Sequence, residues 1–298
     1  MRRGFTFAPW LFLTPFLFLF TLFTVWPLIQ SLILSMQQTY GPGRTEWVGL
    51  HNFKFQLTDP LFWQATGNTV KFALGSLFIQ LPIALGLALL LDRPGLKGRA
   101  YFRLIFFAPS LVGLPFVAML FAPIFEQHTG LLNKALNYFI SNWPLDFPWT
   151  QNYVMTALIL AALWMHAGFN MVYFLAALQN VSRDLIEAAE IDGAGPWARF
   201  WHVTLPEILP IAGFVTLLSV IGSFQLFELS YIMLGDTAGP DNRGLTIVMY
   251  LFQTGFEAGD LGYASTIGWA VGILSCSTSS SESFASSLRR ARRESPWA

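Results

Sequence analysis

The 298-residue sequence has little charge, because only 11% of its residues are Asp, Glu, Lys or Arg. An ordinary soluble domain carries about 25% charged residues, so the composition excludes a typical water-soluble globular protein. Hydrophobic residues make up 54% of the chain, and the mean hydropathy is +0.51. The composition therefore predicts a chain that lies largely within a membrane.

Cysteine is nearly absent, and the single Cys276 excludes an intrachain disulfide and a multi-cysteine metal site. The four histidines are scattered without ligand spacing, so we predict no metal site. The sequence has no G-x-x-x-x-G-K-[ST] phosphate loop, so we expect this chain not to bind ATP or another cofactor itself. No basic patch indicates nucleic acid, and no group of residues resembles a catalytic site.

The sequence does contain a series of long apolar segments. Each has about 20 residues or more, roughly the length that a helix needs to cross the hydrocarbon core. A helix satisfies its own backbone groups in lipid, so we predict an all-α membrane protein. Its six transmembrane helices are expected at about residues 8–36, 67–91, 102–125, 154–178 and 208–234, and from about residue 261 onward.

Basic residues predict the orientation of these helices. With the N-terminus inside, the cytoplasmic segments hold 12 of the 17 Lys and Arg residues: Arg2, Arg3, Arg93, Lys97, Arg99, Arg103, Arg183, Arg199, Arg289, Arg290, Arg292 and Arg293. The other side holds five: Arg44, Lys54, Lys71, Lys134 and Arg243. Basic loops resist translocation, so both termini are predicted to be cytoplasmic. The outer loops would then be residues 37–66, 126–153 and 235–260.

A polar segment, residues 182–206, separates the fourth and fifth predicted helices. Ser182 is placed to cap a short helix, and Gly193 is expected to end it in a left-handed conformation. Pro196 suits the first turn of a second helix. We expect that second helix to pack on the membrane-embedded part of the chain through three aromatic residues, Trp197, Phe200 and Trp201.

Short motifs in this segment carry a family resemblance. They are Glu187-Ala188-Ala189, Asp192-Gly193-Ala194 and Val203-Thr204-Leu205-Pro206. This spacing resembles the EAA loop of permease subunits in ATP-binding cassette (ABC) importers, the loop that docks into the ATPase subunit. Other motifs are similar to the maltose and glycerol-phosphate type of permease and occur in the same order: Gly67-Asn68-Thr69, Phe107-Ala108-Pro109, Gly130-Leu131-Leu132-Asn133, Phe224 to Tyr231, and Gly262-Tyr263-Ala264-Ser265. The match covers roughly residues 47–272.

The resemblance implies a six-helix ABC importer type I permease, in a bacterial or archaeal cell membrane, that imports a sugar, an oligosaccharide or a polyol phosphate. Its implied partners are a second homologous permease, two cytoplasmic ATPases that use ATP and magnesium, and an extracytoplasmic solute-binding protein. The chain would also contact membrane lipid. The ATPase-coupling residues would be Glu187, Ala188, Ala189, Asp192, Gly193 and Ala194.

Polar residues inside the predicted helices are candidates for the solute pathway, because a polar side chain that faces lipid is unfavourable. Asn170, Gln225 and Glu228 are the candidates, and Gln225 and Glu228 are expected to share one helix face. Amide, carboxylate and aromatic groups together suit a sugar. The alternative is that these residues hydrogen-bond neighbouring helices to each other without touching solute; Gln80 and His166 belong to the same set of polar residues.

The sequence beyond Leu274 departs from the resemblance. A serine-rich stretch, residues 275–283, replaces the expected apolar continuation of the sixth helix. We hypothesise an altered reading frame; the alternative is a genuine serine-rich helix that packs on the partner permease. We divide the chain into residues 1–66 (first helix and outer loop), 67–274 (permease core) and 275–298 (Ser/Arg-rich tail).

Two other classes of protein remain as alternatives. A secondary transporter or channel without ATPase partners would favour inverted repeats and ion-coupling carboxylates at mid-membrane, and we find neither in the sequence. A membrane-bound enzyme would need a catalytic cluster near one membrane interface.

Overall fold

The computed structural model describes residues 8–39, 43–93, 95–235 and 237–276. Among these residues the chain is helical except for turns, loops and one two-stranded hairpin. The chain divides into two compact units, Met1–Phe62 with Tyr250–Val271, and Trp63–Met249 with Gly272–Ala298. Each unit is described by itself.

The first unit contains the predicted first span. An apolar helix, Trp10–Ser35, is long enough to cross a membrane and confirms that span. A β-hairpin follows, in which Gln37 lies opposite Trp47. The elements in order are α1 (Ala8–Phe20), a π-helical segment η1 (Thr21–Val25), α2 (Trp26–Ser35), β1 (Gln37–Thr39), β2 (Thr45–Trp47) and α3 (His51–Thr58).

Buried polar contacts hold this unit together. The side-chain amide of Asn52 donates to the carbonyls of Ser35 and Gln37, at 3.0 and 2.9 Å. Gly262, near the start of the helix Leu261–Cys276, lies so close to Gln37 that a Cβ atom would collide with its carbonyl. Glycine at this position therefore allows the last described helix to pack against the hairpin.

Asp59 joins two more parts of the same unit. Its carboxylate is buried and accepts hydrogen bonds from the hydroxyls of Tyr250 and Tyr263, each at 2.5 Å. It also accepts the backbone N–H of Leu61 at 2.9 Å, so it caps the helix that begins at Pro60. A buried carboxylate with three donors is well satisfied, so Asp59 connects α3, α4 and the last described helix.

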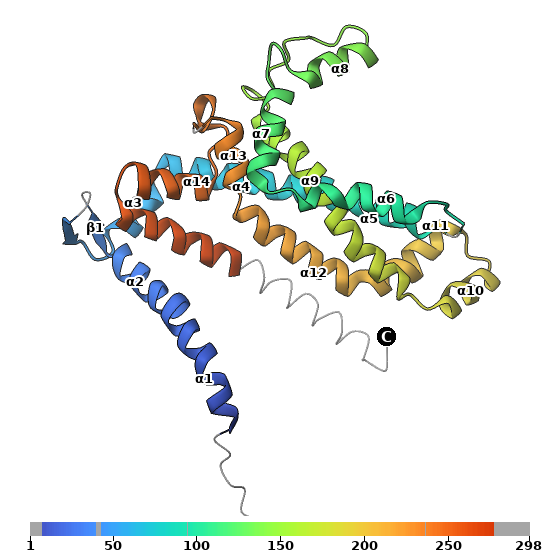
Figure 1. Ribbon diagram of the computed structural model, residues 1–298, viewed down its shortest axis with the longest axis horizontal. Helices are drawn as coiled ribbons and strands as arrows, with labels where there is room; N and C mark the ends of the chain where they lie inside the picture. The colour runs from blue at the N-terminus through green and yellow to red at the C-terminus, as the bar shows by residue number, and fades with distance from the viewer. Residues whose placement is uncertain (1–7, 40–42, 94, 236, 277–298) are drawn as a thin grey trace, which may run out of the picture. The chain divides into compact units, whose positions relative to one another are not determined.

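The second unit is a helical bundle around α9 (Val154–Gln179). This helix packs against α5, α6, η3 and α12, and it supplies much of both buried apolar clusters (Figure 1). The elements in order are α4 (Pro60–Gly75), η2 (Ser76–Gln80), α5 (Leu81–Asp92), α6 (Arg99–Phe107), η3 (Ala108–Leu111), α7 (Leu114–Ile124), α8 (Leu131–Phe139), α9, α10 (Arg183–Ile191), α11 (Pro196–Arg199), η4 (Phe200–Thr204), α12 (Leu205–Phe224), α13 (Glu228–Met233), η5 (Pro240–Asn242) and the start of α14 (Ile247–Phe252). The end of α14 and η6 (Gln253–Glu257) belong to the first unit.

Three of the long helices contain a π-helical turn just before a proline. The π-helical segments η1, η2 and η4 each precede an α-helix whose second residue is proline. These prolines are Pro27, Pro82 and Pro206. A proline ring clashes with the carbonyl of the preceding helical turn and donates no N–H. The wider i→i+5 turn relieves that clash, so these helices continue past proline without a break.

The predicted third span, residues 102–125, is a bent pair of helices. Arg99–Leu111 and Leu114–Ile124 meet at an angle of 97°. Val112 and Gly113 have extended backbones between the two helices, and Pro115 stands in the first turn of α7. The chain therefore contains four helices that could cross a membrane within the described residues, or five if this bent pair is one broken span.

Other predicted boundaries also differ. The second long helix begins at Pro60, not at residue 67, because Asp59 caps it and Pro60 fits its first turn. The predicted outer loop 37–66 accordingly contains α3 and the start of α4. The fourth span is confirmed as Val154–Gln179. The fifth helix runs over Pro196–Phe224 and ends ten residues before the predicted end at 234.

The predicted sixth span is only partly described. The apolar helix Leu261–Cys276 is 16 residues long by its bounds, shorter than the four candidate spans. The rest of the serine-rich tail, residues 277–298, lies outside the described residues. The six-helix count and the cytoplasmic termini therefore stay predictions.

Candidate functional site

The polar segment between α9 and α12 forms a tight helix–turn–helix elbow, α10 followed by α11. Gly193 has φ +80°, and α10 ends in a pair of turn hydrogen bonds. The N–H of Ala194 donates to the carbonyl of Ala189 at 2.9 Å, and the N–H of Gly193 donates to that of Glu190 at 3.0 Å. This is a Schellman motif, which satisfies the last carbonyls of a helix and fixes the direction of the chain after it.

The start of each elbow helix also agrees with the sequence. Ser182 occupies the N-cap position of α10, although its side chain forms no capping hydrogen bond. Pro196 stands in the first turn of α11, directly after the extended Gly195. The sequence prediction of a short helix that ends at Gly193, followed by a helix that begins at Pro196 and runs into the fifth span, is confirmed.

An ion pair joins the two arms of the elbow. The guanidinium of Arg199, in α11, pairs with the carboxylate of Glu190, in α10. Among the described residues, α10 packs against the following α11 and η4 and against no other helix to a comparable extent. The internal turn bonds and this ion pair therefore set the shape of the elbow, while the rest of the bundle contributes little to it.

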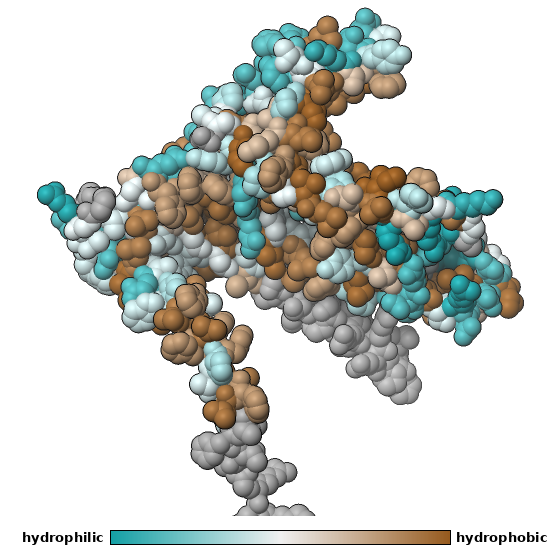
Figure 2. Space-filling model, viewed as in Figure 1, coloured by the Kyte–Doolittle hydropathy of each residue, from teal (hydrophilic) through white to brown (hydrophobic). Residues whose placement is uncertain are grey.

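The elbow is exposed along nearly its whole length. No residue of α10 is buried, and the side chain of Ile191 is 86% exposed. Hydrophilic residues gather over this end of the second unit, with apolar residues among them (Figure 2). The predicted packing of the aromatic residues on the body of the chain is wrong: Trp197 is 73% exposed, and Trp197, Phe200 and Trp201 contact one another in tilted and edge-to-face pairs.

The six predicted coupling residues lie together on this elbow. Glu187, Ala188, Asp192 and Gly193 are exposed, whereas Ala189 and Ala194 are partly buried. The small side chains of Ala188 and Ala189 project little from α10, so the backbone of another protein can approach the helix closely. The arrangement can bind a protein surface that pairs with a carboxylate, such as that of Glu187, and that also forms apolar contacts.

The predicted pathway residue Gln225 marks the end of a helix. α12 ends at Phe224, residues 225–227 leave the helical conformation, and α13 begins at Glu228. Gln225 and Glu228 therefore do not share a helix face, and that prediction is wrong. Gln225 is exposed and Glu228 partly exposed.

Contacts distant in sequence stabilise this break. The hydroxyl of Thr246 donates to the carbonyl of Leu226 at 2.7 Å, and the hydroxyl of Ser230 donates to the carbonyl of Gly244 at 2.6 Å. Both hydroxyl residues are fully buried. A carbonyl freed at a helix break needs such a donor when water is absent.

Asn170, the third pathway candidate, lies in the middle of α9 and is only 6% exposed. It lines neither the cavity beside Lys71 nor the one beside Arg44. This placement is compatible with a side chain that holds neighbouring helices together. Asn170 is thus buried in the helical bundle, whereas Gln225 is exposed.

Sequence reasoning missed two functional elements of this region. The Glu190–Arg199 pair was detectable, because opposite charges flank the Gly193 turn at a distance that an elbow can close. The helix break at Gln225 had no local signal, since neither proline nor glycine occurs between Ser223 and Glu228.

Comparisons with known proteins give one family match and several similar curated proteins. Residues 80–281 match the family described as "Binding-protein-dependent transport system inner membrane component". The chain is 37% identical to the arabinooligosaccharides transport system permease protein AraP of Bacillus subtilis (strain 168), over 88% of this chain and 82% of the relative. It is 33% identical to the lactose transport system permease protein LacF of Rhizobium radiobacter, over 92% of each.

Among solved structures, the fold is similar to a chain of a bacterial alginate ABC transporter in complex with an alginate pentasaccharide-bound periplasmic protein. The TM-score is 0.80 at 22% identity, over 96% of this chain and 95% of that chain. At this identity the likeness supports the fold alone. The family description and the apolar helices together identify a multi-pass membrane protein.

Proposed function

Because this chain belongs to the binding-protein-dependent transport system inner membrane component family, we propose that it is a membrane-spanning permease of an ATP-driven carbohydrate importer. The relatives named for arabinooligosaccharides, lactose and sn-glycerol-3-phosphate support a sugar, an oligosaccharide or a polyol phosphate as the solute. A solute-binding protein would deliver it at a bacterial or archaeal cell membrane.

The partners follow from the same proposal. A second homologous permease completes the passage, and two cytoplasmic ATPases supply the free energy with ATP and magnesium. In this proposal the chain itself is not an enzyme and binds no cofactor. It converts closure of the ATPases into a change in helix packing, which requires contacts that differ between the two arrangements.

The observation that carries the proposal is the exposed and internally braced elbow. Glu187, Ala188, Ala189, Asp192, Gly193 and Ala194 form the coupling surface on it. A rigid element that is exposed and attached to the bundle mainly through α12 moves as one piece when a partner pushes it. The six helices, with both termini on the ATPase side, are part of this proposal.

The helix break at Gln225 is the proposed contact with solute. Broken helices expose amide and carbonyl groups that hydroxyl-rich solutes can bond, and such breaks are tolerated at membrane depth where they face protein or water. Glu228 lies at the start of α13 on the same break. Asn170 has a weaker role in this proposal, since it is buried within the chain.

The test is uptake with the assembled transporter. Glu187→Lys should abolish solute uptake while the chain remains in the membrane, because reversed charge opposes docking of the ATPase. Gln225→Ala should change uptake or solute preference and leave ATPase docking intact. Unchanged uptake in Glu187→Lys, with ATPase still bound, would refute the coupling assignment. Uptake that needs no ATPase would favour the alternative, a secondary transporter or channel.

A further inference from the structure

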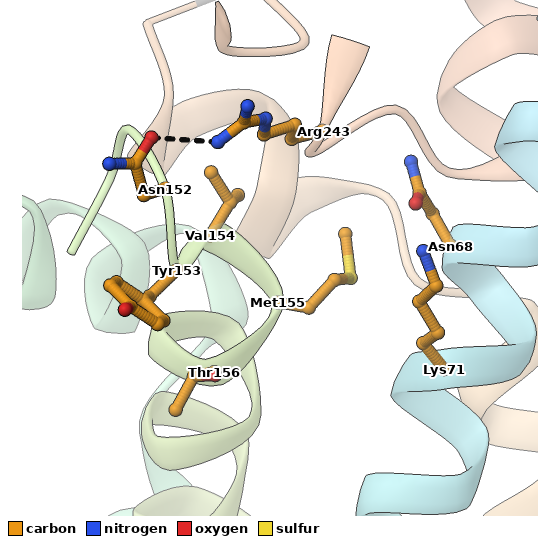
Figure 3. A pocket seen from close by; sticks show the side chains of 8 residues that line it. All are labelled: Asn68, Lys71, Asn152, Tyr153, Val154, Met155, Thr156 and Arg243. Atoms are coloured by element: carbon orange, nitrogen blue, oxygen red, sulfur yellow. Dashed lines mark hydrogen bonds between the residues drawn. The ribbon is translucent and has the colours of Figure 1, made fainter. Parts of the chain in front are cut away.

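A second site, away from the elbow, lies where three segments of the second unit meet. It is a cavity of about 320 Å³. Figure 3 shows Asn68 and Lys71 of α4 on one side, and Arg243 with the first turn of α9 on the other. The lining residues are Asn68, Lys71, Asn152, Tyr153, Val154, Met155, Thr156 and Arg243.

The lining carries positive charge without a carboxylate. Arg243 donates to the side-chain oxygen of Asn152 at 2.7 Å and pairs with Asp241 at 3.3 Å. Asp241 is 79% exposed along its side chain and does not line the cavity. Lys71 forms no hydrogen bond and no ion pair with any residue that the structure describes. One cation of the cavity is therefore available to an anion.

The first turn of α9 adds to this field. The N–H groups of Val154, Met155 and Thr156 have no acceptor within the helix, and the side chain of Tyr153 does not cap them. The N-terminal end of a helix carries a partial positive charge. These groups line the same cavity as Lys71 and Arg243, so the cations and the helix end act on the same space.

The scaffold around the cavity is fixed by hydrogen bonds. The side-chain amide of Asn68 donates to the carbonyls of Asn242 and Leu245, at 3.0 and 3.1 Å. The N–H of Ile247 donates to the hydroxyl of Thr69 at 3.0 Å. The loop that carries Arg243 is thereby held against α4, which carries Lys71, and both cations line the same cavity.

The position of the cavity is that of a membrane–water interface. α9 is a candidate span that begins at Val154, and the half-exposed Tyr153 directly precedes it, as aromatic residues do at such interfaces. Lys71 lies one turn before Leu74 on α4, and Leu74 and Phe78 are exposed apolar residues; Phe78 is 69% exposed. A cationic cavity thus lies beside an exposed apolar surface.

We propose that this cavity binds the headgroup phosphate of an anionic phospholipid, whose acyl chain lies along Leu74 and Phe78. Lys71 contacts the phosphate as a mobile cation, and Arg243 and the first turn of α9 complete the binding site. A lipid fits better than free phosphate because only a lipid also contacts the apolar surface formed by Leu74 of α4 and Phe78 of η2. This inference does not depend on the transported solute.

The experiment measures lipid binding to the full chain, purified in detergent with its associated subunits. Thermal unfolding is followed with added phosphatidylglycerol, with phosphatidylcholine of the same acyl chains, or with inorganic phosphate. We expect phosphatidylglycerol to raise the unfolding temperature of the unmodified protein, and the other two additives to have much weaker effects.

Lys71→Gln is the informative variant, because Lys71 holds no other described residue in place. We expect it to weaken phosphatidylglycerol binding about 10-fold, and Lys71→Arg to retain most of it. Lys134→Gln, which removes an exposed cation on α8 away from the cavity, is the matched control and should bind as the unmodified protein does.

Three results would overturn the proposal. Equal binding in Lys71→Gln and in the unmodified protein would remove the cavity as the site. Equal stabilisation by phosphatidylcholine would remove the charge requirement. Stabilisation by inorganic phosphate as strong as that by phosphatidylglycerol would replace the lipid with a free anion.

Discussion

Gly193 holds a backbone conformation that residues with a side chain rarely adopt, with φ at +80°. We expect Gly193→Val to destabilise the left-handed conformation at the end of α10 by about 1–2 kcal/mol, because Cβ crowds the following carbonyl in that region of backbone angles. If the elbow transmits force, solute uptake should be lost while the protein stays in the membrane. Uptake is compared per amount of membrane-inserted protein.

Gly195 provides the matched control for this prediction. It has φ −68°, and no atom lies within 4 Å of the position that a Cβ would occupy. Gly195→Ala should therefore leave uptake near the unmodified level. Similar loss of uptake in both variants would show that any side chain in the turn is harmful, which would contradict the specific role of the Gly193 conformation.

Glu126, in the loop after α7, gives a prediction about pH. The N–H of Thr129, the hydroxyl of Thr129 and the N–H of His128 all donate to its carboxylate and lower its pKa from 4.5 to about 2. Because the folded pKa is below the unfolded one, the stabilisation of this turn is fully present above about pH 4.5. It is lost as the pH falls through about 2.

The measurement is a titration of the Glu126 carboxyl carbon by NMR in selectively labelled protein. The midpoint should lie near pH 2 in the unmodified protein and should rise in Thr129→Val, which lacks the hydroxyl donor. A midpoint near the ordinary value in the unmodified protein would show that the three donors do not hold the carboxylate in solution.

The brace between α10 and α11 leads to a prediction about the elbow as a whole. Glu190→Arg and Arg199→Glu each place like charges across the turn, so each should change the angle between the two helices. Because the pair is partly exposed, we expect a small loss of folding stability, below about 1 kcal/mol. Uptake should fall several-fold in each single variant, since the coupling surface is displaced.

The double variant, Glu190→Arg with Arg199→Glu, restores opposite charges and is the control. It should recover most of the uptake and of the ATP hydrolysis stimulated by the solute-binding protein. Failure of the double variant to recover either activity would indicate that the individual side chains contact the ATPase, and would contradict a bracing role.

The break between α12 and α13 depends on a buried donor. Thr246→Val removes the hydroxyl that donates to the carbonyl of Leu226 and leaves that carbonyl without its donor. We expect a loss of about 1–3 kcal/mol in the free energy of unfolding, measured by denaturation in detergent micelles. Thr237→Val, at an exposed position in the same region, should change it little; equal effects would argue against the role of Thr246.

The predictable elements are formed by interactions between residues close in sequence. The elements that could not be predicted depend on residues far apart in sequence. α9 follows from an uninterrupted apolar run, and the elbow follows from Gly193 and Pro196, which act on the backbone locally. The start of α4 was also encoded locally, in Asp59 and Pro60, but hydropathy alone places it too late. The break at Gln225 depends on Thr246, 20 residues or more away, and no local pattern reveals it.

For candidate sites the same distinction holds. The coupling residues form one continuous segment, so their proximity was visible in the sequence. The cavity at Lys71 joins residues from positions 68 to 243, and only the folded chain brings them together. Hydropathy also could not show that residues 99–124 are bent, because the composition of a broken helix and that of a straight one are alike.

The path of the whole chain through the membrane depends on that bent pair. As one broken span, α6 and α7 carry the chain across, so that Arg99 and Gln127 lie on opposite sides; as a re-entrant loop, both lie on the same side. The distribution of basic residues favours a crossing, because Arg99 and Arg103 lie in the first half of α6 and no Lys or Arg occurs between Ile124 and Gly130.

Labelling of single cysteines in intact cells separates the two arrangements. In a Cys276→Ser background, which contains no other cysteine, Gln127→Cys should react with a membrane-impermeant maleimide added outside. Ala188→Cys, on the elbow, should react only after the membrane is permeabilised. If Gln127→Cys is protected in intact cells and reacts together with Ala188→Cys after permeabilisation, the bent pair is re-entrant. α8 and its loop would then lie on the opposite side of the membrane from the predicted one. The orientation inferred from the basic residues would be wrong for this part of the chain.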